Sequence, residues 1–544
     1  MIHSLKVLKF LALIFISQSL FAQHTTYQKI DSLFTSYTDP NKTGSALSII
    51  KSGETVYERY AGLANIEHGV AISDSTTFNI ASVSKQFTSF LALLLEQEGK
   101  LSFSDDIRVH LPELKNLPNK ITIKQLTNHT HGLANVDELA LLKGIETMSH
   151  QEVVAMLLNI EQPNFKSGDN YVYNNTGYVL LSEIIQRVGK KAFKVQLDER
   201  IFTPLGMKNS QTINDHNTVI KNKAYSYRQN ETGYTNFPVK ITTIGSSGIY
   251  TTLPDLMLWV KNYQHTTLGK RSFYDKMKDT TVLNSGKRIN YGSGLQFKTY
   301  KGIDVVFHGG GTEAYRSYVL HAPEHNLSFV FLSNNGGFEG LNIIYQSLEY
   351  LLKDLIKPEQ ALAPEHTMAD LNNFEGTYEV HPGTYYTIIA EKGKLYFQEF
   401  GQTGKGELPA MAKNVFDFPF VPHSKFVFSK DKFDFHIADF TYACKKTTIK
   451  LPEQKDLNLN DFVGVYENVA HGTSYELVIA NNQLVAKHRT LPYNIYLNPL
   501  SKTSFYSNAG FFGKLDFTFD SMGNTNGFKV SGQNLKNFVF KKIK

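Results

Sequence analysis

The chain has 544 residues, which is too long for one hydrophobic core and predicts two to four domains. Its composition, 41% hydrophobic and 19% charged residues, is typical of a folded globular protein and excludes a disordered chain. The formal net charge of +6 is mild, and no block of lysine and arginine would follow a phosphate backbone, so we expect no nucleic-acid partner.

The first segment, residues 1–22, has the layout of a secretory signal peptide. Lys6 and Lys9 come first, an apolar run follows over 10–16, and small and polar residues come last. The apolar run is shorter than the roughly 20 residues that span a bilayer. We therefore expect an exported, periplasmic protein with no membrane span after cleavage. Its one cysteine, Cys444, excludes an internal disulfide and a cysteine-based zinc site.

The next segment, residues 24–356, mixes strand and helix patterns. A hairpin is predicted over 43–62, where apolar residues flank the turn "SGE". Helices are predicted over 78–100, 151–160, 176–190, 253–263 and 340–356, and a strand over 327–334. Strands near both ends, with helices between, predict an α/β (α+β) sandwich in which the terminal strands pair in one sheet.

Two all-β units are predicted after a proline-containing linker at 357–370. They occupy 371–455 and 456–544, and alternating aromatic residues give both a strand period of two. The stretch "LNNFEGTYE" in the first unit recurs as "LNDFVGVYE" in the second, which indicates an internal repeat. We interpret the aromatic alternation as core packing, with a binding groove as the alternative.

The start of the 78–100 helix carries an unusual pair. Ser82 and Lys85 lie three residues apart, so both side chains share one face of a helix. A serine becomes a nucleophile when a base takes its proton, and burial among apolar residues lowers the pKa of a lysine enough to make it such a base. Backbone N–H groups at a helix start also favour a developing anion. The alternative is a capping serine beside a solvated lysine.

The S-x-x-K spacing alone is weak evidence, because it also occurs at Ser48–Lys51 and Ser429–Lys432. Two further motifs follow Ser82 in order: "YNN", which begins at Tyr173, and "HGGG", which begins at His308. Each is common by itself. The flanking stretches "FNIASVSKQFTS", "ITIKQLTNHTHGL", "YNNTGYVLLSEIIQRVGKK" and "HGGGTEAYRS" are more specific.

Together, these motifs resemble the β-lactamase-related serine hydrolases: class C β-lactamases, penicillin-binding DD-peptidases, D-aminopeptidases and related esterases. The resemblance covers about residues 40–345. It implies a β-lactamase/transpeptidase-like sandwich with an antiparallel sheet and a helical subdomain, followed here by the two small all-β units.

The resemblance also implies roles for individual residues. Ser82 would be acylated, and Tyr173, held by Lys85, would be the general base and later the proton donor. Such a role requires neighbouring cations to lower the pKa of Tyr173 from about 10. Asn175 would hydrogen-bond Lys85 or the substrate amide.

The third motif would lie on a sheet edge strand and bind the substrate through His308, Gly309 and Gly310. The oxyanion hole would use the backbone N–H groups of Ser82 and Gly311. Glycines suit this strand because the substrate would lie close to its backbone.

Two positions depart from the family pattern. His308 replaces a lysine, and a histidine is mostly neutral at pH 7, so it would not hold a substrate carboxylate as a permanent cation. This favours a peptidase or esterase over an efficient β-lactamase. His131 stands where serine is usual. His129 and His131 have no third metal ligand near them in the sequence, so we expect both to be structural. Asn174 is expected only to fill the loop. No metal or other cofactor is predicted.

We therefore predict an exported serine hydrolase that forms an acyl-enzyme on Ser82. Its partner would be a small-molecule or peptide substrate: a peptide, amide or ester, including substrates with a D-amino acid. The alternative is a penicillin-recognising or envelope-binding protein with little or no turnover. A further hypothesis is that one β unit sends a loop to the active site. The sequence leaves open the exact substrate, acylation by β-lactams and the oligomeric state.

Overall fold

The structure is a computed structural model of the chain. It describes residues 25–35, 39–145, 147–158, 160, 162–337, 339–357, 368–421, 423–437, 440–449 and 457–544. The predicted signal peptide at 1–22 and most of the predicted linker at 357–370 lie outside the described residues. Within the described ranges, no helix is both long enough and apolar enough to cross a bilayer.

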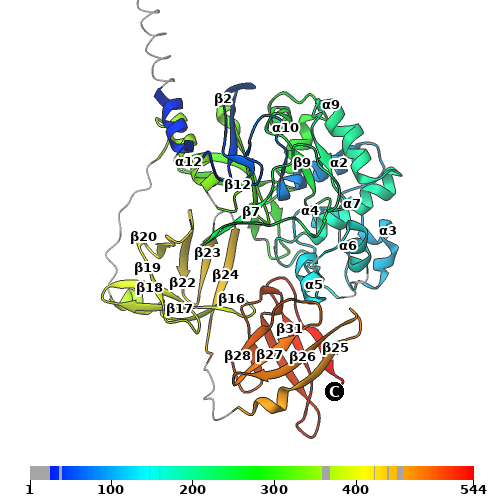
Figure 1. The fold of residues 1–544 in the computed structure, drawn as a ribbon, viewed down its shortest axis with the longest axis vertical. Helices are drawn as coiled ribbons and strands as arrows, with labels where there is room; N and C mark the ends of the chain where they lie inside the picture. Colours follow the sequence, from blue (N-terminus) through cyan, green and yellow to red (C-terminus); the bar gives the residue numbers. More distant parts are fainter. Residues whose placement is uncertain are drawn as a thin grey trace, which may run out of the picture.

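A six-stranded antiparallel sheet forms the centre of the N-terminal unit, the described part of residues 25–357 (Figure 1). Its strand order is β12-β13-β14-β15-β1-β2. The strands are β1 (Ser45–Lys51), β2 (Glu54–Ala61), β12 (Gln296–Tyr300), β13 (Ile303–Thr312), β14 (Tyr315–Ala322) and β15 (Leu327–Ser333). Because β1 pairs with both β2 and β15, the predicted hairpin and the predicted pairing of the terminal strands are confirmed.

Both faces of this sheet are covered. Every residue of β15 is buried, and its side chains alternate between two hydrophobic clusters. Phe329 and Phe331 pack toward the helix over residues 25–35 and α12 (Glu339–Leu351). Val330 and Leu332 join the cluster on the other face. This explains why the sequence shows a continuous apolar run at 327–334 rather than an apolar–polar alternation.

The helix that follows Ser82 begins later than predicted. Ser82 lies in η1 (Ala81–Val83), a single 3-10 turn, and α2 spans Ser84–Gln97. Ala81 has a φ of +45°, which an α-helix does not allow, so no regular helix extends back through Ala81, and Ser82 lies in the short turn before α2. The body of α2 is buried, and Phe87 stacks on Trp259 with ring centroids 4.2 Å apart.

The other predicted helices are present with shifted ends. Three of them pack into the cluster that contains Val330 and Leu332: α6 (His150–Leu157), α7 (Thr176–Gly189) and α10 (Leu253–His265). Two short helices that were not predicted, α4 (Ile123–Thr127) and α5 (Val136–Leu142), join the same cluster. Thr252 caps α10 by accepting a hydrogen bond from the Asp255 N–H at 3.3 Å, as its sequence suggests. The closing helix α12 ends at Leu351, short of the predicted residue 356.

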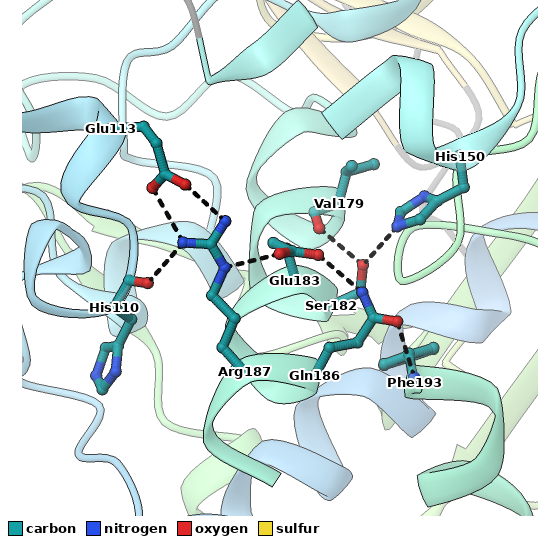
Figure 2. Close-up of polar contacts among 9 residues, drawn as sticks. All are labelled: His110, Glu113, His150, Val179, Ser182, Glu183, Gln186, Arg187 and Phe193. Carbon is teal, nitrogen blue, oxygen red and sulfur yellow. Dashed lines mark hydrogen bonds and ion pairs between the residues drawn. The ribbon is translucent and has the colours of Figure 1, made fainter. Parts of the chain in front are cut away.

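Helix α7 is held along its second half by a polar network (Figure 2). Arg187 binds Glu183, one turn earlier, at 2.7 Å, and both oxygens of Glu113 at 2.8 and 3.0 Å. Gln186 also donates to Glu183, and Ser182 contacts His150 of α6 at 3.5 Å. These contacts fix the helix whose first residues follow the "YNN" motif.

Two β units follow the N-terminal unit (Figure 1). The first is a nine-stranded sheet, whose strands run along the chain from β16 (Gly376–His381) to β24 (Phe440–Thr447). In space, its two outer strands are β19 (Lys405–Leu408) and β20 (Ala410–Ala412). The second is a closed barrel. Its strands are β25 (Gly464–Asn468), β26 (Thr473–Ala480), β27 (Gln483–Lys487), β28 (Ile495–Pro499), β29 (Ser504–Tyr506), β30 (Lys514–Phe519), β31 (Thr525–Ser531) and β32 (Phe538–Lys542).

The sequence repeat is visible in the side chains of both units. The Tyr378 hydroxyl donates to the Phe374 carbonyl at 2.9 Å, and the Tyr466 hydroxyl donates to the Phe462 carbonyl at 2.8 Å. Both tyrosines are fully buried. Each repeated stretch therefore bends from a short helical turn into a strand and fixes the bend with its own tyrosine.

The barrel shares a hydrophobic cluster with the N-terminal unit. Tyr475 and Phe512 of the barrel belong to the same buried cluster as Phe87 and Trp259. The contact runs through η7 (Gly510–Phe512), which packs on α5. By contrast, the nine-stranded sheet has an aromatic cluster of its own.

We predict that Phe512→Ala lowers the free energy of unfolding by about 3–5 kcal/mol, because it leaves a cavity in the shared cluster. Chemical denaturation followed by circular dichroism measures this loss. Phe519→Ala, at a barrel position that is 39% exposed, is the matched control and should change stability by less than about 1 kcal/mol. Equal losses in the two variants would contradict a shared core.

Candidate active site

Ser82 and Lys85 are in direct contact at the start of α2. Lys85 Nζ lies 2.9 Å from Ser82 Oγ, 2.8 Å from Asn175 Oδ1 and 2.9 Å from the Ser246 carbonyl oxygen. The lysine is fully buried. A solvated lysine beside a capping serine, the alternative reading of the sequence, does not fit this geometry.

The partners of Lys85 determine how it interacts when it is neutral. Burial lowers the pKa of Lys85 to about 7, against the opposing charge of Asp137. A neutral amine has two N–H donors and one lone pair. Asn175 Oδ1 and the Ser246 carbonyl only accept hydrogen bonds, so both N–H groups point to them. The lone pair then faces the Ser82 hydroxyl and is placed to accept its proton.

Tyr173 lies on the other side of the serine. Its hydroxyl is hydrogen-bonded to the Ser82 side chain, and its ring centroid is 5.0 Å from Lys85 Nζ. Burial raises the pKa of Tyr173 above its usual 10, and the hydrogen bond between Tyr173 and Ser82 offsets only part of this rise. We had expected neighbouring cations to lower this pKa. The structure differs because the nearest cation, Lys85, is itself driven toward its neutral form, so the phenol is suited to donate a proton.

Asn175 is held by two residues that the sequence analysis did not identify. Its side-chain N–H donates to Asp137 Oδ2 at 2.7 Å, and its backbone N–H donates to Asn135 Oδ1 at 3.2 Å. Since a carboxylate only accepts, Asp137 fixes the amide with its oxygen toward Lys85. The sequence carries a weak signal here, because Asp137 and Glu138 are acidic residues in the first turn of α5. The ordinary role of such residues is to stabilise a helix start.

His308 lies behind the cavity and does not line it. Its side chain is fully buried, with Nδ1 2.7 Å from the Gly309 carbonyl and Nε2 3.0 Å from the Tyr291 hydroxyl. A carbonyl accepts only, so Nδ1 carries the proton and Nε2 accepts from Tyr291. Burial lowers the pKa of His308 to about 3, which keeps it neutral. The predicted contact with substrate is therefore absent from this arrangement, although the predicted neutrality is consistent with it.

The glycines of the third motif lie in the second half of β13. This strand is not at the edge of the sheet as expected, because β12 pairs with residues 303–307. Beyond Phe307, β12 has ended, so only the glycine half has an open edge. An added Cβ on Gly310 would come within 2.4 Å of the Ile80 carbonyl and 3.1 Å of Ser82 N. Gly310 thus permits close packing against the turn of Ser82, a reason different from the predicted approach of substrate.

The turn that carries Ser82 has an unusual backbone. The positive φ of Ala81 is uncommon for a residue with a side chain and recurs at functional sites. It is fixed from both sides: Asn79 Oδ1 accepts from the Ala81 N–H at 2.8 Å, and the Ser317 hydroxyl donates to the Ile80 carbonyl at 2.6 Å. The turn therefore holds Ser82 at a defined position between α2 and β13.

The remaining predictions concern neighbours of Tyr173. His129 packs on the Tyr173 ring with centroids 4.3 Å apart, and His131 accepts from the Leu133 N–H at 3.0 Å, so both lie in structural positions. Asn174 is not the filler that we expected. Its side chain is buried, donates to the Leu133 carbonyl at 2.8 Å and accepts from the Thr176 N–H at 3.0 Å.

A cavity of about 420 Å³ opens over the serine. It is lined by the predicted residues Ser82, Tyr173, Asn175 and Gly309–Gly311, and also by Thr312, Glu313, Arg316, Tyr318, Phe331 and Leu341. The second group comes from β13, β14, β15, α12 and the turn at Glu313, and the sequence does not show which side chains of these elements meet at the cavity.

A comparison with protein families identifies the fold around this cavity. The family model described as Beta-lactamase matches residues 30–346, which is more than half of the chain. The chain belongs to the Beta-lactamase family. The predicted β-lactamase/transpeptidase-like fold class is thereby confirmed, with the all-β units as additions to it.

Individual relatives agree with the family match. Penicillin-binding protein 4* of Bacillus subtilis (strain 168) is 26% identical over 399 residues, which are 69% of this chain and 87% of that protein. A D-aminopeptidase of Brucella anthropi is 26% identical over 302 residues, 55% of this chain and only 56% of that enzyme. The octameric penicillin-binding protein homologue from Pyrococcus abyssi aligns with a TM-score of 0.55 at 20% identity, covering 86% of this chain and 99% of that chain. These similarities support a serine hydrolase of the Beta-lactamase family.

We predict that the rate at which a fluorophosphonate labels Ser82 rises with pH through an apparent pKa of about 7, because Lys85 must be neutral to take the serine proton. Asp137→Asn should shift this rise to lower pH, since the Asp137 charge raises the pKa of Lys85. The matched control is Asp304→Asn, an exposed acid at the other end of β13, which should leave the profile unchanged. A shift to higher pH in Asp137→Asn would contradict the role given to Lys85.

Proposed function

We propose that this protein is an exported serine hydrolase that hydrolyses a small peptide, amide or ester through an acyl-enzyme on Ser82. One observation carries the proposal: a fully buried lysine, with its two N–H groups directed to obligatory acceptors, presents its lone pair to the serine hydroxyl 2.9 Å away. That arrangement activates a nucleophile, and a packing role for Ser82 does not require it.

The reaction follows from the positions of the groups. Ser82 Oγ attacks the substrate carbonyl carbon while its proton passes to Lys85 Nζ. The N–H groups of Ser82 and Gly311 would bind the oxyanion that forms. Tyr173 donates its hydroxyl proton to the departing amine or alcohol, and the proton held by Lys85 then passes to the Tyr173 oxygen, which leaves both groups neutral. Water then attacks the acyl-enzyme by the same steps in reverse order, which releases the acid.

The polar groups of the cavity favour a peptidase or amidase over an efficient β-lactamase. His308 is neutral and turned away from the cavity, so the third motif offers no fixed cation to a substrate carboxylate. Glu313 lines the cavity beside Arg316 and accepts a hydrogen bond from Thr312. A carboxylate in this place suits a substrate with a free α-amino group. This agrees with the similarity to D-aminopeptidases, and we include D-amino-acid substrates in the proposal.

Export remains a proposal from residues 1–22, whose two lysines and short apolar run are typical of a signal peptide. A relative that aligns with most of this chain is named a penicillin-binding protein. The second candidate function is therefore recognition of penicillin-like or envelope ligands with little turnover. In that case Ser82 would be acylated once and released slowly.

The proposed function predicts that a fluorophosphonate or a fluorescent penicillin labels the purified protein on Ser82 and that Ser82→Ala abolishes labelling. Ser429→Ala, in the exposed hairpin that repeats the S-x-x-K spacing, is the matched control and should label normally. Persistent labelling of Ser82→Ala would disprove the proposal. Labelling without hydrolysis of p-nitrophenyl esters and D-amino-acid amides would favour the second candidate function.

We predict that Glu313→Gln raises the KM for D-amino-acid amides with a free α-amino group by about tenfold, because a charge-assisted hydrogen bond is lost. The KM for the N-acetylated amides should change by less than about twofold. Steady-state kinetics on both substrate series, with the exposed Glu324→Gln as control, measures the difference. An equal rise for both series would mean that Glu313 shapes the cavity and does not bind the amine.

A further inference from the structure

A loop of the C-terminal barrel contacts the start of α5. The loop joins β31 to β32, and its centre is Asn534. The Asn534 backbone N–H donates to both carboxylate oxygens of Glu138, at 2.8 and 3.0 Å, and its side-chain N–H donates to the same group at 2.8 Å. The Asn534 carbonyl accepts from the Asn135 N–H at 3.1 Å and from the Asn164 side chain at 2.8 Å. A single barrel residue therefore makes hydrogen bonds to three residues of the N-terminal unit.

The contact is tightly built. Glu138 is only 9% exposed, and α5 lies against the barrel (Figure 1). An added Cβ on Gly532 would lie 2.4 Å from the Gly510 carbonyl and 2.9 Å from Glu138 Oε2, so the loop approaches too closely for a side chain there. The titratable neighbours of Glu138 are Asp137 on the same helix and Tyr442 on β24. Burial raises the pKa of Glu138 to about 7, and the N–H donors of Asn534 offset part of this rise, so the group is mostly a carboxylate at pH 8.

The same helix start holds the partner of Lys85. Asn135 and Asp137 bind the backbone and the side chain of Asn175, as described above, and the Val136 N–H donates to the Thr176 hydroxyl at 2.9 Å. Asn534 is thus connected to Lys85 by hydrogen bonds to Glu138, by the backbone of α5 from Glu138 to Asp137, and by the hydrogen bonds of Asn175 to Asp137 and Lys85.

The barrel also holds the far end of α5. The Tyr475 hydroxyl donates to the Leu142 carbonyl at 3.0 Å, and Thr490 donates to the Gly144 carbonyl. With 7 residues, α5 is too short to be stable alone. Its position is therefore set by what it contacts, and the barrel contacts both of its ends.

We propose that Asn534 is a positioning residue for the active site: it holds the start of α5 so that Asp137 keeps the Asn175 amide oxygen on Lys85. The inference rests on the proposed function, because its test measures the reactivity of Ser82. If α5 moved, the Asn175 amide would lose its fixed orientation and could turn its NH2 group toward Lys85. The lone pair of the lysine would then have no fixed direction toward Ser82.

The decisive variant is Asn534→Asp, which keeps the shape of the side chain, removes its N–H donors and sets a carboxylate against Glu138. Asn537→Asp introduces the same charge at an exposed position of the same loop and is the matched control. At pH 8 we expect Asn534→Asp to lower the rate of fluorophosphonate labelling by about tenfold or more relative to wild type, and Asn537→Asp to stay within about twofold. Asn534→Ala, which loses only the side-chain bond, should fall between them.

The dependence on pH separates positioning from general damage. At pH 5 one of the two facing carboxyl groups holds a proton and donates to the other, so the ratio of Asn534→Asp to wild type should return to within about twofold. A ratio of one at pH 8, or an equal loss at both pH values, would overturn the proposal.

Amide hydrogen exchange of residues 173–178 gives a readout that needs no activity. Exchange should be faster in Asn534→Asp at pH 8 and unchanged in Asn537→Asp. Unchanged exchange in Asn534→Asp would overturn the proposal even if labelling fell. A wild-type protein that is not labelled at all would instead count against the proposed function, and the exchange data would still test the positioning.

Discussion

The active site depends on one buried amine. Lys85 is fully buried beside the rings of Tyr173 and Tyr178, so its ammonium form is disfavoured. It makes three contacts, and two of them are with groups that only accept. The two N–H groups of the neutral amine point to these acceptors, so its lone pair points toward the third partner, the Ser82 hydroxyl. Burial of a lysine costs free energy, and Lys85 lies where, under the proposed function, a neutral amine takes the proton of Ser82.

The surroundings of this amine are arranged to keep its partners in place. Asn175 begins α7, whose second half is held by the Arg187 network, and its amide is oriented by Asp137. On the other side, the strained turn at Ala81 and the close approach of Gly310 fix the serine. The rigid parts of the molecule, the sheet and the long helices, therefore meet at a small group of polar atoms whose hydrogen-bonding capacity is almost fully used.

Much of this arrangement could be predicted from the sequence. The terminal hairpin, the helices and the repeat follow from periodicity and turn residues, and the motifs at Ser82, Tyr173 and His308 indicate the family. What could not be predicted depends on tertiary contact. The burial that reverses the expected pKa of Tyr173, the Tyr291 hydroxyl behind His308 and the carboxylate of Asp137 all come from segments distant in the chain. Local sequence carries no sign of which distant polar atom will complete a hydrogen bond.

The barrel closes only when β25 pairs with β32, a strand that ends two residues before the last residue of the chain. Its hydrophobic residues join the cluster that contains α2, and its last loop reaches α5. The two strands that close the barrel are thus its first and its last, so closure has to wait until the strands between them have formed. Contacts between residues so far apart in the chain form slowly, and the docking of the barrel on α5 depends on them.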